Sequence, residues 1–136
     1  MPSVATSLII NNDGKLLILK RSNKVKTYKG FWGGVAGYIE KNEKPIETAY
    51  KEISEEVGLE KEYLILKREL DPIKITDFYE NKRYEWEIFV FLFELSKKSD
   101  IKIDWEHSEY KWIKASEITN FKTVPYLKEI VKKIIT

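Results

Sequence analysis

Three carboxylates, Glu52, Glu55 and Glu56, are the residues of this chain whose types and spacing first suggest chemistry. Residues at i, i+3 and i+4 lie on one face of a helix, so these side chains would gather in one patch and repel one another. A hard divalent cation would relieve that repulsion, and Mg²⁺ is the commonest such partner when phosphates supply further ligands. A solvated acidic helix face would show the same spacing, so the surrounding residues have to decide.

A wider pattern surrounds the three glutamates in residues 37–59. Its fixed positions hold Gly37, Glu43, Lys51, Glu52, Glu55, Glu56, Gly58 and Leu59. The stretch resembles the Nudix box, G-x5-E-x7-REUxEExGU with U an aliphatic residue, and only Lys51 departs from it, where the family has arginine. The resemblance implies a metal-dependent hydrolase of nucleoside diphosphates linked to another moiety. It also implies an α+β (mixed α/β) fold, the Nudix α/β/α sandwich, with a mixed sheet, a central box helix and a C-terminal helix.

The resemblance assigns roles to the box residues. Glu52, Glu55 and Glu56 would bind Mg²⁺, with Mn²⁺ as the alternative, and a backbone carbonyl at Gly37 or Ala36 would join them. The approach to the box ends Val35-Ala36-Gly37 where the family usually has Pro-Gly-Gly, which leaves open which of the two carbonyls serves.

Two further roles follow from the box. Glu43 would pair with Lys51 and tie the loop to the helix, more loosely than an arginine fork would. Glu52 and Glu106 are both candidates for the base that takes the proton from water.

A second, weaker resemblance lies far along the chain, where Glu106-His107 precedes an aromatic strand that ends at Trp112. In several Nudix proteins the loop before this strand supplies another carboxylate to the metal site. We expect Glu106 in that role, with Glu109 as second choice, against the alternative of surface acids. His107 is the only histidine, and a lone histidine is more often structural than catalytic.

A basic stretch precedes the box. Residues 15–39 contain no acidic residue but six basic ones. Arg21, Lys26 and Lys29 are our candidates for binding phosphate oxygens, because a polyphosphate with a metal ion needs cations opposite the carboxylates. A solvated basic face is the alternative.

Aromatic side chains could stack on a base. Tyr28, Phe31 and Tyr79 are the substrate-binding candidates, with Phe78 and Trp86 beside them, and core packing is the alternative for each. Trp32 is expected in the core.

The substrate is less defined than the chemistry. A (d)NTP or oxidised (d)NTP, cleaved to the monophosphate and pyrophosphate, fits the short chain and the Glu-His segment best. ADP-ribose, a dinucleoside polyphosphate, coenzyme A, or a non-catalytic nucleotide sensor on the same fold are the alternatives. Isopentenyl diphosphate isomerase shares the fold but relies on a cysteine, and this chain has none.

The elements that must position these residues can be read from local patterns. Pro45 suits a helix start and Gly58 the position just after its end, so we predict a helix over 45–57 with an apolar stripe opposite the glutamates. Asn12-Asp13-Gly14 predicts a hairpin turn. Strands are predicted over residues 4–10, 15–21, 63–70, 73–79, 83–95 and 101–103. A helical turn capped by Ser116 and an amphipathic helix over 124–135 should close the chain.

Chain length, net charge and the number of cysteines limit the remaining classes of protein. A chain of 136 residues predicts one domain, residues 1–136. The net charge of only +2 argues against a nucleic-acid coat or a membrane patch, and no apolar run is long enough to span a bilayer. Disulfides are excluded because there is no cysteine. We therefore expect a cytoplasmic enzyme, monomer or homodimer, whose partner is a small-molecule nucleotide.

Overall fold

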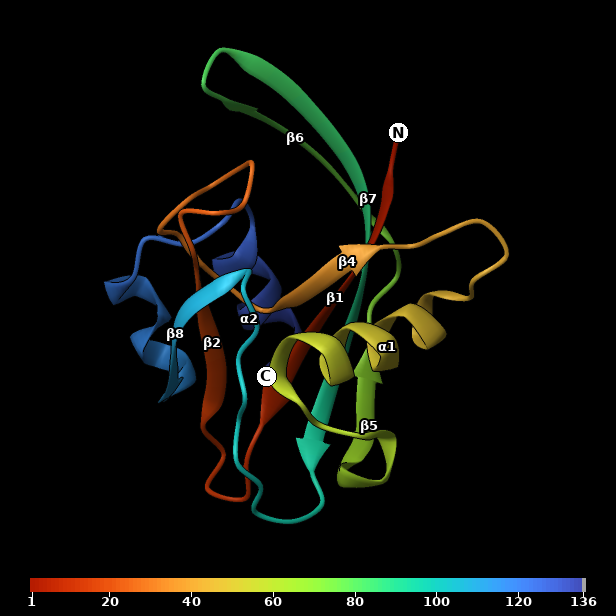
Figure 1. The fold of residues 1–136 in the computed structure, drawn as a ribbon, viewed down its shortest axis with the longest axis vertical. Coiled ribbons are helices and arrows are strands. Elements are labelled where there is room, and N and C mark those ends of the chain that lie inside the picture. Colours follow the sequence, from red (N-terminus) through yellow and green to blue (C-terminus); the bar gives the residue numbers. More distant parts are fainter. Residues whose placement is uncertain (136) are drawn as a thin grey trace.

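A mixed sheet lies between two helices in the computed structural model, which describes residues 1–135 (Figure 1). Helix α1 (Pro45–Val57) covers one face and helix α2 (Leu127–Ile135) the other. The strands are β1 (Ser3–Ile10), β2 (Leu16–Arg21), β3 (Trp32–Gly33), β4 (Val35–Tyr38), β5 (Leu64–Glu69), β6 (Ile73–Tyr79), β7 (Lys82–Leu95) and β8 (His107–Ile113). Short 3₁₀ helices, η1 (Lys61–Tyr63) and η2 (Ala115–Asn120), complete the chain. No helix within residues 1–135 is long and apolar enough to cross a membrane.

Strand β1 organises the sheet and creates its opening. Strand β7 pairs in parallel with the whole length of β1, and so occupies one of its two edges. Strands β4 and β2 must share the other edge: β4 pairs with its first half, and β2 meets it at Ile10↔Leu16. Beyond that point β2 turns away to pair with β3 and β8. The two halves of the sheet therefore diverge between β2 and β4.

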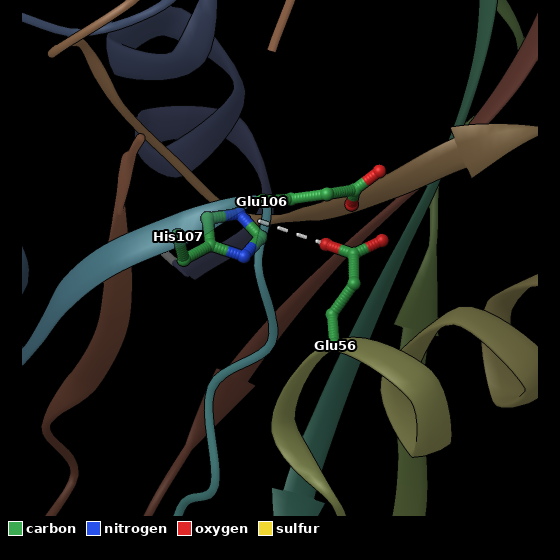
Figure 2. A group of neighbouring side chains, drawn as sticks. All are labelled: Glu56, Glu106 and His107. Atoms are coloured by element: carbon green, nitrogen blue, oxygen red, sulfur yellow. Dashed lines mark ion pairs between the residues drawn. The ribbon is translucent and has the colours of Figure 1, made fainter. Parts of the chain in front are cut away.

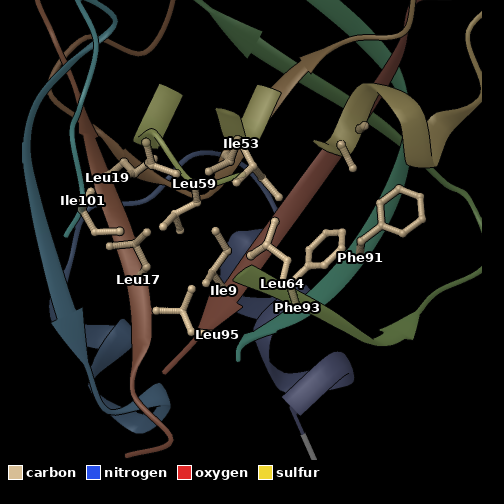
Figure 3. Close-up of a cluster of buried hydrophobic side chains, with 14 residues drawn as sticks. Ile9, Leu17, Leu19, Ile53, Leu59, Leu64, Phe91, Phe93, Leu95 and Ile101 are labelled. Atoms are coloured by element: carbon tan, nitrogen blue, oxygen red, sulfur yellow. The ribbon is translucent and has the colours of Figure 1, made fainter. Parts of the chain in front are cut away.

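Side-chain alternation along β1 builds a core on each face. Ala5 and Ile9 pack beneath α1, whereas Leu8 packs on the opposite face beneath α2. Figure 3 shows the first of these cores, to which Ile53 of α1 and Phe91 and Phe93 of β7 belong. The core beneath α1 fixes the position of this helix, and hence of its glutamates, relative to the sheet.

Helix α1 begins and ends where the sequence predicts. Pro45 occupies its first turn, and Gly58 adopts a left-handed φ of 73° just past its end. The predicted apolar stripe faces the sheet, with Ala49, Ile53 and Val57 fully buried. The prediction succeeds because both signals, the caps and the 3.6-residue period, are local.

A long hairpin, β6–β7, extends away from the body of the protein (Figure 1). Glu80 and Asn81 both have positive φ, 49° and 65°, so they form the tight turn at its tip. Strand β7 pairs with β6 along its first half and with β5 along its second. One strand thus joins the hairpin to the centre of the sheet.

Two local predictions were wrong, and the predicted C-terminal helix begins later than expected. Residues 101–103 form no strand, because Lys102 N–H donates to Val57 O and Asp104 N–H to Glu56 O. These bonds fasten the segment to the end of α1. Ser116 lies inside η2, whose cap is Lys114, and α2 begins at Leu127 rather than at residue 124.

Candidate active site

Glu56, Glu106 and His107 form a compact group at the end of α1 and the start of β8 (Figure 2). One ligand atom from each residue lies within 4.8 Å of the other two. His107 Nε2 is 3.7 Å from Glu56 Oε1, and both side chains are almost completely buried. Segments fifty residues apart in sequence therefore meet because β8 pairs with β2 beside the opening of the sheet.

Glu52 lies one turn before Glu56 and packs against the backbone of β4. A Cβ built on Gly37 would overlap the Glu52 side chain, at separations that real Cβ atoms do not show. The glycine at this position thus permits the close approach of helix and strand. Glu55 is exposed on the same helix.

Burial raises the pKa values of the carboxyls at this site. Burial raises the pKa of Glu56 well above its usual range, and its neighbours Glu52 and Glu106 add to the effect. Burial also raises the pKa of Glu52 and of Glu106; a neighbouring carboxylate contributes to each. A divalent cation would reverse this tendency by favouring the ionised carboxylates.

The chemistry of the donors fits a metal ion. The Glu56 carboxyl is almost completely buried and has the Glu52 carboxyl as a hydrogen-bonding neighbour, so the two repel each other when both are ionised unless a cation satisfies them. Glu52, Glu56 and Glu106 offer the oxygen ligands that Mg²⁺ and Mn²⁺ prefer. The Gly37 backbone lies beside Glu52, and both residues line the same cavity.

Asp104 holds His107 from the other side. Its Oδ1 lies 3.1 Å from His107 Nδ1, and it also accepts a 3.2 Å hydrogen bond from Glu106 N–H. Burial lowers the pKa of His107, against the opposing effect of Asp104. The sequence interpretation treated His107 as structural, and nothing in the spacing pointed to Asp104.

Arg21 lies on the basic side of the site. Its Nε donates a 2.9 Å hydrogen bond to Thr27 O, and burial lowers its pKa while Glu106 and Glu56 raise it. Arg21 therefore stands within electrostatic reach of the carboxylates. Lys26 and Lys29 are exposed on the loop that follows β2.

An aromatic cluster joins this loop to the β6–β7 hairpin. Tyr28 contacts the rings of Phe31, Tyr79 and Trp86, and its hydroxyl donates a 2.6 Å hydrogen bond to Asp77 Oδ2. Phe78 alternates to the outer face and is 69% exposed. Asp77 was missed from the sequence, although the period-2 pattern of β6 places it on the same face as buried Ile75.

A cavity of about 350 Å³ connects the carboxylates with apolar side chains. Glu52, Glu106, Gly37 and Arg21 contribute polar or charged lining. The apolar lining comes from Val4, Tyr28, Ile75, Trp86, Ile88 and Pro125. Trp32 is not part of it and is buried, as predicted.

Fold and site together combine an α/β/α sandwich with a cluster of carboxylates that could hold a metal ion. A family model described as the NUDIX domain matches residues 1–134, so the chain belongs to the Nudix family and is a Nudix hydrolase. The box residues therefore lie in the fold that their spacing implied.

Sequence relatives agree with this assignment. The chain is 28% identical over 120 residues to the nucleoside triphosphatase NudI of Escherichia coli, a match that covers 83% of this chain and 82% of the relative.

Solved structures share the fold. A Caenorhabditis elegans Ap4A hydrolase matches with a TM-score of 0.79 at 18% identity, covering 98% of this chain and 94% of that one. The dihydroneopterin triphosphate pyrophosphohydrolase of Escherichia coli matches with a TM-score of 0.78 at 21% identity, over the same shares of the two chains.

Proposed function

We propose that this chain is a pyrophosphohydrolase that cleaves (d)NTPs or oxidised (d)NTPs to the monophosphate and pyrophosphate, using Mg²⁺ or Mn²⁺. The observation that carries the proposal is the mixed lining of the cavity, which brings carboxylates and Arg21 together with apolar and aromatic side chains. A nucleotide likewise combines a charged polyphosphate with an aromatic base. The similarity to a nucleoside triphosphatase supports the same substrate class.

The proposed metal ligands are Glu52, Glu55 and Glu56 with a carbonyl at Gly37. A divalent ion held there neutralises phosphate charge and lowers the pKa of bound water. Glu55 is exposed, but it neighbours Glu56 and stands at i+3 from Glu52, so its carboxylate can turn toward the same ion.

The remaining residues bind and orient the substrate. The Arg21 guanidinium, which lines the same cavity, donates to phosphate oxygens. Glu52 and Glu106, with their raised pKa values, are the two candidates to accept the proton of the attacking water. The Tyr28, Tyr79 and Trp86 rings present faces on which a base can pack. Lys26 and Lys29 would act at longer range, on the charged phosphates that approach the site.

The experiment is a product assay with Mg²⁺ and a panel of dNTPs, oxidised dNTPs, ADP-ribose and dinucleoside polyphosphates. We expect monophosphate and pyrophosphate from the triphosphates. Preferred cleavage of ADP-ribose or a dinucleoside polyphosphate would replace the substrate assignment. Tight nucleotide binding without turnover of any substrate would instead support a sensor.

Glu56→Gln tests the assignment of the site and should abolish turnover. Its matched control is Glu47→Gln on the exposed face of the same helix, where the side chain only caps Lys44 N–H and glutamine can still accept that bond. Equal losses in the two variants would contradict the assignment.

A further inference from the structure

The surroundings of His107 differ from those of a histidine that only fills space in the core. Its side chain is 3% exposed, and its Nε2 is directed at the Glu56 carboxylate across 3.7 Å, beyond hydrogen-bond distance. Figure 2 shows Glu106 beside the same gap. A buried nitrogen and two carboxylates thus lie around one small space, and Glu56 Oε1 is the oxygen nearest to His107.

Asp104 fixes which nitrogen faces this space. A carboxylate can only accept, so the 3.1 Å contact with Asp104 Oδ1 places the proton of neutral His107 on Nδ1. Asp104 is itself anchored, since its N–H donates to Glu56 O and its Oδ1 accepts from Glu106 N–H. Nε2 therefore carries the lone pair of neutral His107, and it lies 3.7 Å from Glu56 Oε1. A carboxylate behind a histidine is the arrangement that orients metal-ligating imidazoles.

The spacing agrees with a shared ion. Ligands on opposite sides of an ion at roughly 2.1 Å lie about 4 Å apart. The three ligand atoms lie within 4.8 Å of one another, so a shift of less than about 1 Å would bring all three into contact with one ion. The Glu52 and Glu106 carboxylates also act on that of Glu56, and a cation in this space would relieve their repulsion.

We propose that His107 Nε2 is a direct ligand of a divalent metal ion, together with Glu56 and Glu106. The nitrogen donor makes this position select Mn²⁺ over Mg²⁺, because imidazole suits transition metals whereas Mg²⁺ prefers oxygen. The proposal rests on the metal dependence of the proposed function and adds a nitrogen ligand to it.

The first experiment uses the unaltered full chain with Mn²⁺ and no substrate. Pulsed electron paramagnetic resonance should show a nitrogen coupling to Mn²⁺. That coupling should take the nitrogen-15 pattern when the histidine is isotopically labelled. His107 is the sole histidine of the chain, so such a signal has one assignment. Bound Mn²⁺ without histidine coupling would overturn the proposal and would leave His107 as a bridge between Asp104 and Glu56.

The second experiment compares metal dissociation constants by calorimetry. His107→Gln should weaken Mn²⁺ binding by about tenfold or more and Mg²⁺ binding by less than about threefold. The matched control is Glu47→Gln, an exposed carboxylate in the first turn of α1, which should change neither constant. Equal weakening of both ions in His107→Gln would contradict a nitrogen ligand.

Two features keep the outcomes separable. Circular dichroism of each variant detects misfolding, and the resonance experiment on the unaltered chain stands even if His107→Gln does not fold. Metal binding is measured without substrate. Histidine coupling without turnover would therefore refute the proposed function alone, whereas turnover without histidine coupling would refute this inference alone.

Discussion

Lys51 Nζ lies 2.7 Å from Glu43 Oε2, and this ion pair ties the loop before α1 to the middle of the helix. Glu43 Oε1 accepts two further hydrogen bonds, from the Thr48 hydroxyl and from Glu40 N–H. The carboxylate thus closes the loop on itself as well as on the helix. Lysine supplies the charge for this tie but only one of the two bonds that an arginine fork would make.

Lys51→Arg should therefore leave turnover intact or raise it, because arginine keeps the charge and adds a second donor to Glu43. Lys51→Ala should lower kcat by roughly tenfold, since a loop that drifts also displaces the backbone near Gly37. Steady-state kinetics of the two variants measure the effect. A large loss in Lys51→Arg would refute a role for this pair as a tie.

The same carboxylate should make stability depend on acid. The hydrogen bond from Lys51 leads the effects that lower the pKa of Glu43 from 4.5 to about 2. Because the pKa of Glu43 is lower in the folded chain than in the unfolded chain, ionised Glu43 stabilises the fold above about pH 4.5. This stabilisation is lost as the pH falls from about 4.5 toward 2. Melting temperatures of the unaltered chain and Glu43→Gln should therefore converge over this range. Parallel curves would contradict the prediction.

Glu56→Gln should stabilise the metal-free protein while removing activity. Burial raises the pKa of Glu56 in the folded chain. Protonated Glu56 therefore contributes fully to folding stability below about pH 4.5, and this contribution is lost as the pH rises through the pKa of Glu56 in the folded chain. Glutamine carries no charge and escapes that loss. Thermal melts in a chelator at neutral pH should show a higher melting temperature for the variant. Added Mn²⁺ should then stabilise the unaltered chain more than the variant, and the reverse order would argue against Glu56 as a ligand.

Gly37→Ala should displace Glu52, because the new Cβ would occupy the position of that side chain. We expect kcat to fall by about 10- to 100-fold, as for other small misplacements of reacting groups. Gly33→Ala is the matched control: its Cβ would meet only Val124, at 3.4 Å. Kinetics and circular dichroism of both variants decide whether the loss comes from the site or from the fold.

Tyr28→Phe should raise KM by roughly three- to tenfold with little change in kcat. It removes the 2.6 Å bond to Asp77, whose net worth is about 1 kcal/mol, and so loosens one wall of the cavity. Asp77→Asn keeps an acceptor for the Tyr28 hydroxyl and should retain most of the affinity. If Asp77→Asn loses as much as Tyr28→Phe, the hydrogen bond is not the cause.

The amino-acid sequence determined the elements whose signals are local. Pro45, Gly58 and the apolar stripe between them set helix α1, and Asn12-Asp13-Gly14 set the first turn. These predictions hold because capping, turn geometry and periodicity act over a few residues. The spacing of the box residues indicated the family for the same reason, since the box carboxylates on α1 belong to one helix.

Only the tertiary structure determined which of these elements meet at the site. Residues 101–103 have a strand-like sequence, but their N–H groups found partners at the end of α1 instead of on a sheet edge. Those bonds bring Asp104 and His107 to Glu56, and no spacing rule connects residues fifty positions apart. Burial then raises the pKa of Glu56 and directs a lone histidine at it, because desolvation and orientation depend on what the whole fold encloses.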